Sequence, residues 1–148
     1  MKTKRIAFLG GGNMAEAIIG GLLAGGVSME RNVAAADVSA ERRALLAEKY
    51  GIGTPETGAE AVRGADVVVL AVKPQQAAEA LAAAREAFTD RQLLVSICAG
   101  LRTAALQHQV PARTVRAMPN LPALVRRGVT AVCAGARATA AELDLAEE

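Results

Sequence analysis

The sequence predicts an α/β protein with a doubly wound, mostly parallel sheet and helices on both faces. Short apolar runs alternate along the chain with segments of helical periodicity. Several of these runs are continuously apolar, which is typical of parallel strands buried on both faces. The first run ends in glycines that open directly into a helical pattern. This is the strand–turn–helix unit with which such a sheet starts.

Six apolar runs are predicted to form the strands. Each is bounded by glycine, proline or polar residues, as strands usually are. The predicted strands are Arg5–Leu9, Asn32–Ala36, Val67–Val72, Leu93–Cys98, Thr114–Met118 and Val129–Ala134.

Helical periodicity fills the intervals between the strands. Ser39 is a favourable N-cap and Gly51 a favourable stop for the second helix, and Pro74 stands where the third begins. The predicted helices are Met14–Ala24, Ala40–Lys49, Gln75–Phe88, a short one near Thr103–Gln109 and one from Thr139 to the end. The expected buried stripes are Met14, Ile18 and Leu22 in the first helix, and Ala77, Leu81, Ala84 and Phe88 in the third.

The sixth predicted strand is expected to follow a loop. Only about ten residues separate Met118 from Val129, and Pro119 and Pro122 disfavour a helix between them. We therefore expect this loop to lead to an antiparallel or neighbouring strand. The pattern after Ala138 stays helical without a stop signal, so we expect a single domain over residues 1–148 that is interrupted before its last strand.

The composition excludes several classes of function. Apolar residues make up 52% of the chain, enough for one core, but aromatic residues only 2%, too few to stack bases. The 17 basic and 15 acidic residues are intermixed, which argues against a nucleic-acid or anionic membrane partner. No apolar run approaches the length of a membrane span. We expect a soluble cytoplasmic protein.

The cysteines and the single histidine carry no predicted chemistry. Cys98 and Cys133 each lie in an apolar run, so we expect two reduced thiols in the core. His108 lies near a predicted helix end and is expected to be solvated. The spacing of these residues offers no metal site and no histidine-based triad, and we assign no catalytic residue to this chain.

The glycines after the first strand predict a dinucleotide site. Gly10, Gly12 and Ala15 occupy the G-x-G-x-x-G/A positions, which provide a sharp turn, close approach of a pyrophosphate and tight helix packing. The amide N–H groups at the start of the following helix favour an anion. Asp37 ends the next apolar run 22 residues after Ala15, where a ribose hydroxyl acceptor belongs. Residues 1–148 are thus predicted to form a Rossmann-type dinucleotide-binding domain.

The other candidate residues follow the carboxyl ends of the predicted strands, where ligands of such sheets bind. Each also has a structural interpretation, as a turn, a helix cap or a solvated helix face. The candidates for the cofactor are Gly10, Gly12, Asn13, Met14, Ala15, Asp37, Ser39, Arg42, Val72, Lys73, Pro74, Ala99, Gly100 and Asn120, with Arg43 and Pro119 beside them.

Four segments resemble the N-terminal dinucleotide-binding domain of pyrroline-5-carboxylate reductases. In order and spacing the resemblance covers all 148 residues, although members of the family more often have Thr where Leu121 stands. The segments are Phe8-Leu-Gly-Gly-Gly-Asn-Met-Ala15, Ala71-Val-Lys-Pro74, Val95-Ser-Ile-Cys-Ala-Gly100 and Arg116-Ala-Met-Pro-Asn-Leu-Pro122.

The resemblance implies hydride transfer from a reduced nicotinamide to the imine of 1-pyrroline-5-carboxylate, which gives L-proline. It implies NADPH as the cofactor, with NADH tolerated. From the residues alone the preference stays open, because Asp37 would repel a 2′-phosphate whereas Ser39, Arg42 and Arg43 would attract it. Members of the family also have a C-terminal helical domain that forms the oligomer and most substrate contacts. We therefore expect this chain alone to lack turnover.

Two other functions remain open at this stage. The first is another reductase on the same scaffold, such as a deazaflavin-dependent NADP reductase or a hydroxyacid dehydrogenase. The segment from Arg116 to Pro122 argues against it. The second is a nucleotide-sensing module without turnover.

Overall fold

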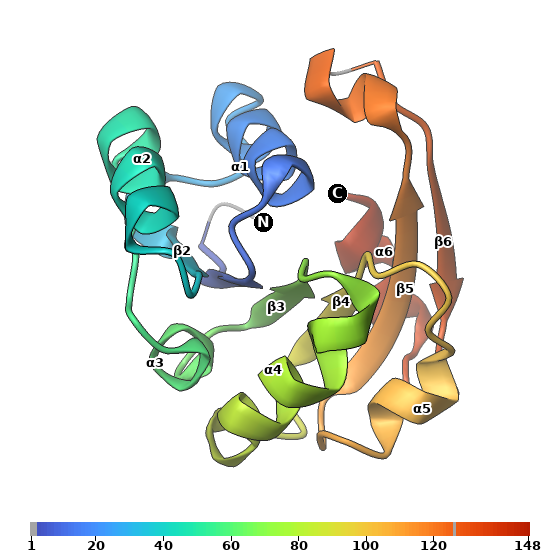
Figure 1. The fold of residues 1–148 in the computed structure, drawn as a ribbon. Helices are drawn as coiled ribbons and strands as arrows, with labels where there is room; N and C mark the ends of the chain where they lie inside the picture. The colour runs from blue at the N-terminus through green and yellow to red at the C-terminus, as the bar shows by residue number, and fades with distance from the viewer. Residues whose placement is uncertain (1–2, 126) are drawn as a thin grey trace.

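The computed structural model describes residues 3–125 and 127–148 and is organised around one six-stranded sheet (Figure 1). The strand order is β2-β1-β3-β4-β5-β6, and every neighbouring pair is parallel except β5 and β6. This confirms the predicted sheet, and it shows that the sixth strand, for which two arrangements were open, is antiparallel to its neighbour β5. The strands are β1 (Ile6–Leu9), β2 (Val33–Ala36), β3 (Val67–Leu70), β4 (Leu93–Ser96), β5 (Arg113–Pro119) and β6 (Thr130–Ala134).

Helices pack on both faces of the sheet (Figure 1). One face carries α1 (Asn13–Ala24), α2 (Ala40–Tyr50) and α6 (Ala140–Glu147), and the other carries α3 (Gly58–Val62), α4 (Ala77–Ala84) and α5 (Thr103–Gln107). Short 3-10 turns complete the fold: η1 (Glu30–Asn32), η2 (Pro74–Gln76), η3 (Arg85–Ala87) and η4 (Leu121–Val125).

The core consists of two apolar layers separated by the sheet. Successive side chains of a strand point to opposite faces, so Phe8 and Val69 enter the layer under α1 and α2, whereas Leu70 and Leu94 enter the layer under α4 and α5. All residues of β1, β3 and β4 are buried. This double burial explains why these strands appear in the sequence as continuous apolar runs.

The observed helices differ from the predicted ones in three places. The third predicted helix is divided into η2, α4 and η3, although its stripe of Ala77, Leu81, Ala84 and Phe88 is buried as expected. The short helix α3, whose N-terminus Thr57 and Glu60 close with a capping box, was not predicted. The loop after β5 contains the 3-10 turn η4 in spite of its prolines.

One prediction about burial holds only in part, and another is wrong. In α1 the fully buried side chains are Ala15 and Ile19, whereas Ile18 and Leu22 are only half-buried because they border an open groove. Cys98 is buried, but Cys133 is exposed because β6 is an edge strand whose residues are mostly uncovered. Both cysteines are free thiols.

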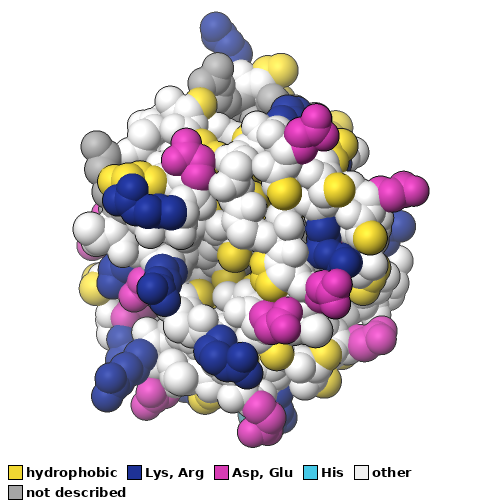
Figure 2. Space-filling view, turned by 90° about the vertical axis from the view of Figure 1, so that its left-hand side faces the viewer, with side chains coloured by type: hydrophobic (Ala, Val, Ile, Leu, Met, Phe, Trp, Pro, Cys, Tyr) yellow, Lys and Arg dark blue, Asp and Glu magenta, His cyan; other side chains and the backbone are white. Residues whose placement is uncertain are grey.

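The surface carries interspersed charges. Figure 2 views the side of the molecule that bears α2 and α3, where lysine and arginine side chains alternate with acidic ones. Within the described residues, none of the helices is long and apolar enough to cross a bilayer.

A polar cluster fastens α6 to the sheet. The Thr139 backbone N–H donates to Glu142 Oε2 at 2.8 Å, the Thr139 hydroxyl donates to the same oxygen, and Arg113 of β5 donates to Glu142 Oε1. These hydrogen bonds, above all the one from the Thr139 hydroxyl, lower the pKa of Glu142 from 4.5 to about 2. The ionised carboxylate thus stabilises the folded state at neutral pH.

We expect Glu142→Gln to lower the free energy of unfolding by about 1 kcal/mol at pH 7. Because the folded-state pKa is depressed, this loss should shrink as the pH falls below 4.5 and vanish only below about pH 2. Urea denaturation at a series of pH values measures it. Asp144→Asn, which removes a charge from the same helix, is the control, and a pH-independent effect of Glu142→Gln would contradict the assignment.

Candidate functional site

The loops that follow the parallel strands all leave the sheet at one edge. Leu9 pairs in register with Ala36 and Leu70, Leu70 pairs with Ser96, and Ser96 pairs with Arg116. All the residues predicted to bind the cofactor follow this row. In the sheet, β2 lies on one side of β1 and β3 lies on the other, so the strand order reverses between β1 and β3. The crevice expected for a ligand lies beyond the carboxyl ends of these two strands.

Gly10 makes the turn at the end of β1. Its φ is +97°, its N–H donates to the Ala36 carbonyl at 2.9 Å, and a Cβ here would lie 2.9 Å from the backbone of Ala71. A side chain would be strained and would collide with the turn after β3. Gly10 therefore allows the sharp turn that the sequence predicted.

Gly12 lies over open space at the N-terminus of α1. A Cβ on this residue would meet nothing within 4 Å, and its φ of −65° is accessible to any residue. Side chains cap α2 and α3, but among the described residues none caps α1. The first N–H groups of a helix lack intrahelical partners, so those of Asn13 and Met14 are available to a ligand. Ala15 beneath them is fully buried and lets α1 pack closely.

Asp37 is fixed beside this loop by two backbone amides. The Gly11 N–H donates to Asp37 Oδ2 at 2.8 Å, and the Ser39 N–H donates to Asp37 Oδ1 at 2.9 Å. Each carboxylate oxygen can accept more than one hydrogen bond. Asp37 therefore shapes the turn after β2 and still has acceptor capacity for a ribose hydroxyl.

The residues after Asp37 hold the loop and the turn together. Ser39 Oγ accepts the Arg42 backbone N–H at 3.2 Å, which confirms Ser39 as the N-cap of α2. The Arg42 side chain donates to the Gly11 carbonyl and to Glu16, and Arg43 donates to the Asp37 carbonyl at 2.8 Å. Both guanidinium groups are thus bound to protein acceptors.

Glu16 was not predicted as part of this site. Its position in the first turn of α1, where an acidic residue favours the helix dipole, was its only signal in the sequence. Its partners on α2 are 26 to 34 residues away along the chain.

The turns after β3 and β4 are joined by Cys98. Its thiol donates to the carbonyl of Val72 at 3.2 Å and to that of Leu70 at 3.6 Å, and burial raises its pKa. Cys98 is therefore a protonated structural thiol. It sets Val72, which is half-buried, beside the exposed residues Lys73, Pro74, Ala99 and Gly100.

Asn120 closes the loop after β5. Its side-chain Oδ1 accepts the Val129 N–H at 3.0 Å, and its carbonyl accepts the Ala123 N–H at 3.0 Å. The turn η4 that follows packs against α1. Asn120 thus has a structural role at the edge where the sequence placed it.

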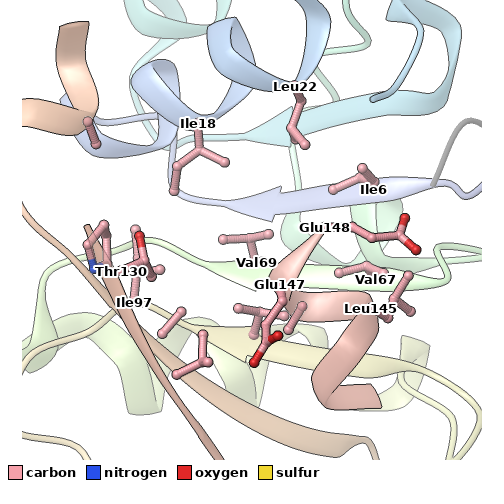
Figure 3. Close-up of a pocket in the computed structure, with 16 residues that line it drawn as sticks. Ile6, Ile18, Leu22, Val67, Val69, Ile97, Thr130, Leu145, Glu147 and Glu148 are labelled. Atoms are coloured by element: carbon pink, nitrogen blue, oxygen red, sulfur yellow. The ribbon is translucent and has the colours of Figure 1, made fainter. Parts of the chain in front are cut away.

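A groove lies on the face of the sheet between α1 and α6 (Figure 3). This groove of about 390 Å³ is lined by Ile18 and Leu22 of α1, by apolar strand residues and by Leu145 of α6. Glu147 and Glu148 are its acidic lining residues. An apolar wall with carboxylates offers little to the phosphates of a dinucleotide, so the candidate site is the strand edge.

Comparison with known families places the chain among oxidoreductases. Residues 5–100 match the family described as "NADP oxidoreductase coenzyme F420-dependent". The chain belongs to this family. The matched range of this chain includes the glycine loop, Asp37 and the turns after β3 and β4.

Individual proteins are similar to this chain over nearly its whole length. A pyrroline-5-carboxylate reductase of Pseudomonas aeruginosa is 46% identical over 99% of this chain and 54% of its own length, and one of Haemophilus influenzae is 42% identical over 90% and 49%. The reductase structure from Coxiella burnetii has a TM-score of 0.93 at 34% identity, covering 99% of this chain and 55% of that one. These findings confirm the resemblance to the nucleotide-binding half of pyrroline-5-carboxylate reductases. The chain spans about half the length of these relatives.

We expect Gly12→Val to abolish dinucleotide binding and to change stability by about 1 kcal/mol or less. The new side chain has room in the protein but would fill the space over the first turn of α1. Thermal unfolding and calorimetric titration with NADPH measure the two effects.

Gly21→Val is the matched control for this variant. A Cβ on Gly21 also meets nothing within 4 Å, but the residue lies two turns along α1, away from the loop. Its affinity for NADPH should equal that of the unaltered chain. Undiminished affinity of a folded Gly12→Val variant would exclude the glycine loop as the binding site.

Proposed function

We propose that this chain is the NADP(H)-binding unit of a reductase that converts 1-pyrroline-5-carboxylate to L-proline. The observation that carries the proposal is the uncapped N-terminus of α1, open above Gly12 and adjacent to the fixed carboxylate of Asp37. Similarity to pyrroline-5-carboxylate reductases over 99% of the chain supports the substrate. The related reductase of Plasmodium falciparum, 25% identical with a TM-score of 0.86, is described with NADP bound.

In this proposal, different residues of the strand edge bind different parts of the cofactor. The amides of Gly12, Asn13 and Met14 hold the pyrophosphate, with Gly10 and Ala15 shaping the loop. Asp37 accepts from the adenosine ribose, with Ser39 and Arg42 nearest to its 2′ position. The nicotinamide half lies along the turns after β3, β4 and β5, formed by Val72, Lys73, Pro74, Ala99, Gly100 and Asn120.

The chemistry belongs to the cofactor. When bound, the reduced nicotinamide supplies a hydride to the imine carbon, and uptake of a proton by the imine nitrogen completes the amine. The residues of this chain bind the cofactor, orient its ring and shield one side of it from water. In our proposal, the part of the relatives that this chain does not span supplies the substrate contacts and the homo-oligomer interface.

The cellular setting is also proposed. The reaction is the last step of proline biosynthesis in the proposed pathway. The two free thiols, one of them exposed on β6, fit a reducing cytoplasm.

A coenzyme F420-dependent NADP reductase is the alternative suggested by the family description. That match ends at residue 100, before β5 and the turn at Asn120. The reductases of pyrroline-5-carboxylate match beyond this point over 90% or more of the chain, which favours the imine substrate.

We expect the 148-residue chain to bind NADPH and NADH but to show no oxidation of NADPH with 1-pyrroline-5-carboxylate above the blank. Calorimetric titration and the loss of NADPH absorbance measure binding and turnover. Failure to bind either nucleotide would contradict the proposed cofactor site. Clear turnover would show that catalysis needs nothing beyond these residues, and the proposed division of labour would be wrong.

A further inference from the structure

Both backbone polar groups of Gly11 are hydrogen-bonded to side chains. Its N–H donates to Asp37 Oδ2 at 2.8 Å, and its carbonyl accepts from Arg42 Nε. A Cβ on Gly11 would lie 2.8 Å from Leu46 Cδ1, so α2 is in direct contact with the glycine loop. The guanidinium of Arg42 and the carboxylate of Asp37, which is proposed to bind the adenosine ribose, therefore bind the same residue, Gly11.

Arg42 shares its second acceptor, Glu16, with two other residues of α2. Arg42 Nη2 donates to Glu16 Oε2, whereas Lys49 Nζ and Tyr50 Oη donate to Glu16 Oε1 at 2.8 and 3.2 Å. These contacts, led by the hydrogen bond from Lys49, hold the pKa of Glu16 below its usual value in spite of partial burial. Glu16 is thus an ionised carboxylate with two cationic partners.

Because Lys49 also pairs with Glu16, Arg42 can leave Glu16 at a low cost. Removing the only partner of a partly buried charge is costly, because the remaining charge is left uncompensated. If Arg42 left Glu16, Lys49 would still neutralise it through Oε1. A phosphate dianion is a stronger partner for a guanidinium than a carboxylate that is already paired.

Arg43 has a different role. Its side chain donates to the carbonyls of Asp37 and Val38 and approaches Glu56 at 3.8 Å. Those contacts fix the turn after β2 and do not involve Glu16. Arg42 is therefore the arginine whose partner can be exchanged.

We propose that Glu16 sets the preference between NADPH and NADH by competing with the 2′-phosphate for Arg42. The inference rests on the proposed cofactor site. NADH leaves the pair between Glu16 and Arg42 in place, whereas NADPH draws Arg42 from Glu16 while Lys49 stays. Glu16 is thus a specificity-determining residue that need not touch the cofactor.

Calorimetric titration of the whole chain with NADPH and with NADH tests this proposal. Glu16→Gln should strengthen NADPH binding about twofold to fivefold, the effect of removing one competing ion pair, and leave NADH binding unchanged. Lys49→Met should act in the opposite sense and weaken NADPH alone, because release of Arg42 would then leave Glu16 without a cationic partner, with only the Tyr50 hydroxyl as a donor. In the Arg42→Ala background, Glu16→Gln should change neither affinity.

Glu48→Gln is the charge control. It removes an acidic charge from an exposed position of α2, and it should leave the NADPH to NADH ratio unchanged. If Glu48→Gln raised the NADPH to NADH affinity ratio as much as Glu16→Gln, the effect would come from net charge alone, and the proposal would be overturned. Equal weakening of both cofactors by Glu16→Gln would show that Glu16 only braces the loop, and an unchanged ratio would equally contradict competition. If the unaltered chain bound neither NADPH nor NADH, that result would instead refute the proposed function.

Discussion

The left-handed backbone at Gly10 is the constraint on which the site depends. Its φ of +97° turns the chain at the carboxyl end of β1, and the backbone of Ala71 lies where a side chain would stand. This turn brings Gly11 against Asp37 and aligns α1 so that its uncapped N-terminus opens at the edge of the sheet. The loop, the helix start and the acidic residue form one unit because a single residue without a side chain allows them to meet.

The sequence predicted the features that depend on local pattern. Buried parallel strands require continuous apolar runs, and helix ends require caps, so the six strands and the cap at Ser39 were predictable. The residues of the strand edge were found because parallel strands place their carboxyl ends together. Helix α3 was missed because its five residues carry too little periodicity, although Thr57 and Glu60 have the spacing of a capping box.

Contacts between distant segments were not predictable from the pattern. Glu16 meets Arg42, Lys49 and Tyr50 only because α1 and α2 pack side by side, with Tyr50 close to Gly20. The exposure of Cys133 follows from the edge position of β6 and not from its apolar neighbours. Asn120 likewise shows its structural role only through Val129, on the other side of a loop.

Two places on the molecule differ in character: the polar strand edge at the start of α1, and the apolar groove between α1 and α6. NMR titration of the isotope-labelled chain with NADP⁺ distinguishes them most directly, because each backbone amide reports its own surroundings. The account predicts the largest shifts at the amides from Gly11 to Ala15 and from Asp37 to Ser39. Shifts concentrated at Ile18, Leu22 and Leu145, with the loop amides unmoved, would contradict it.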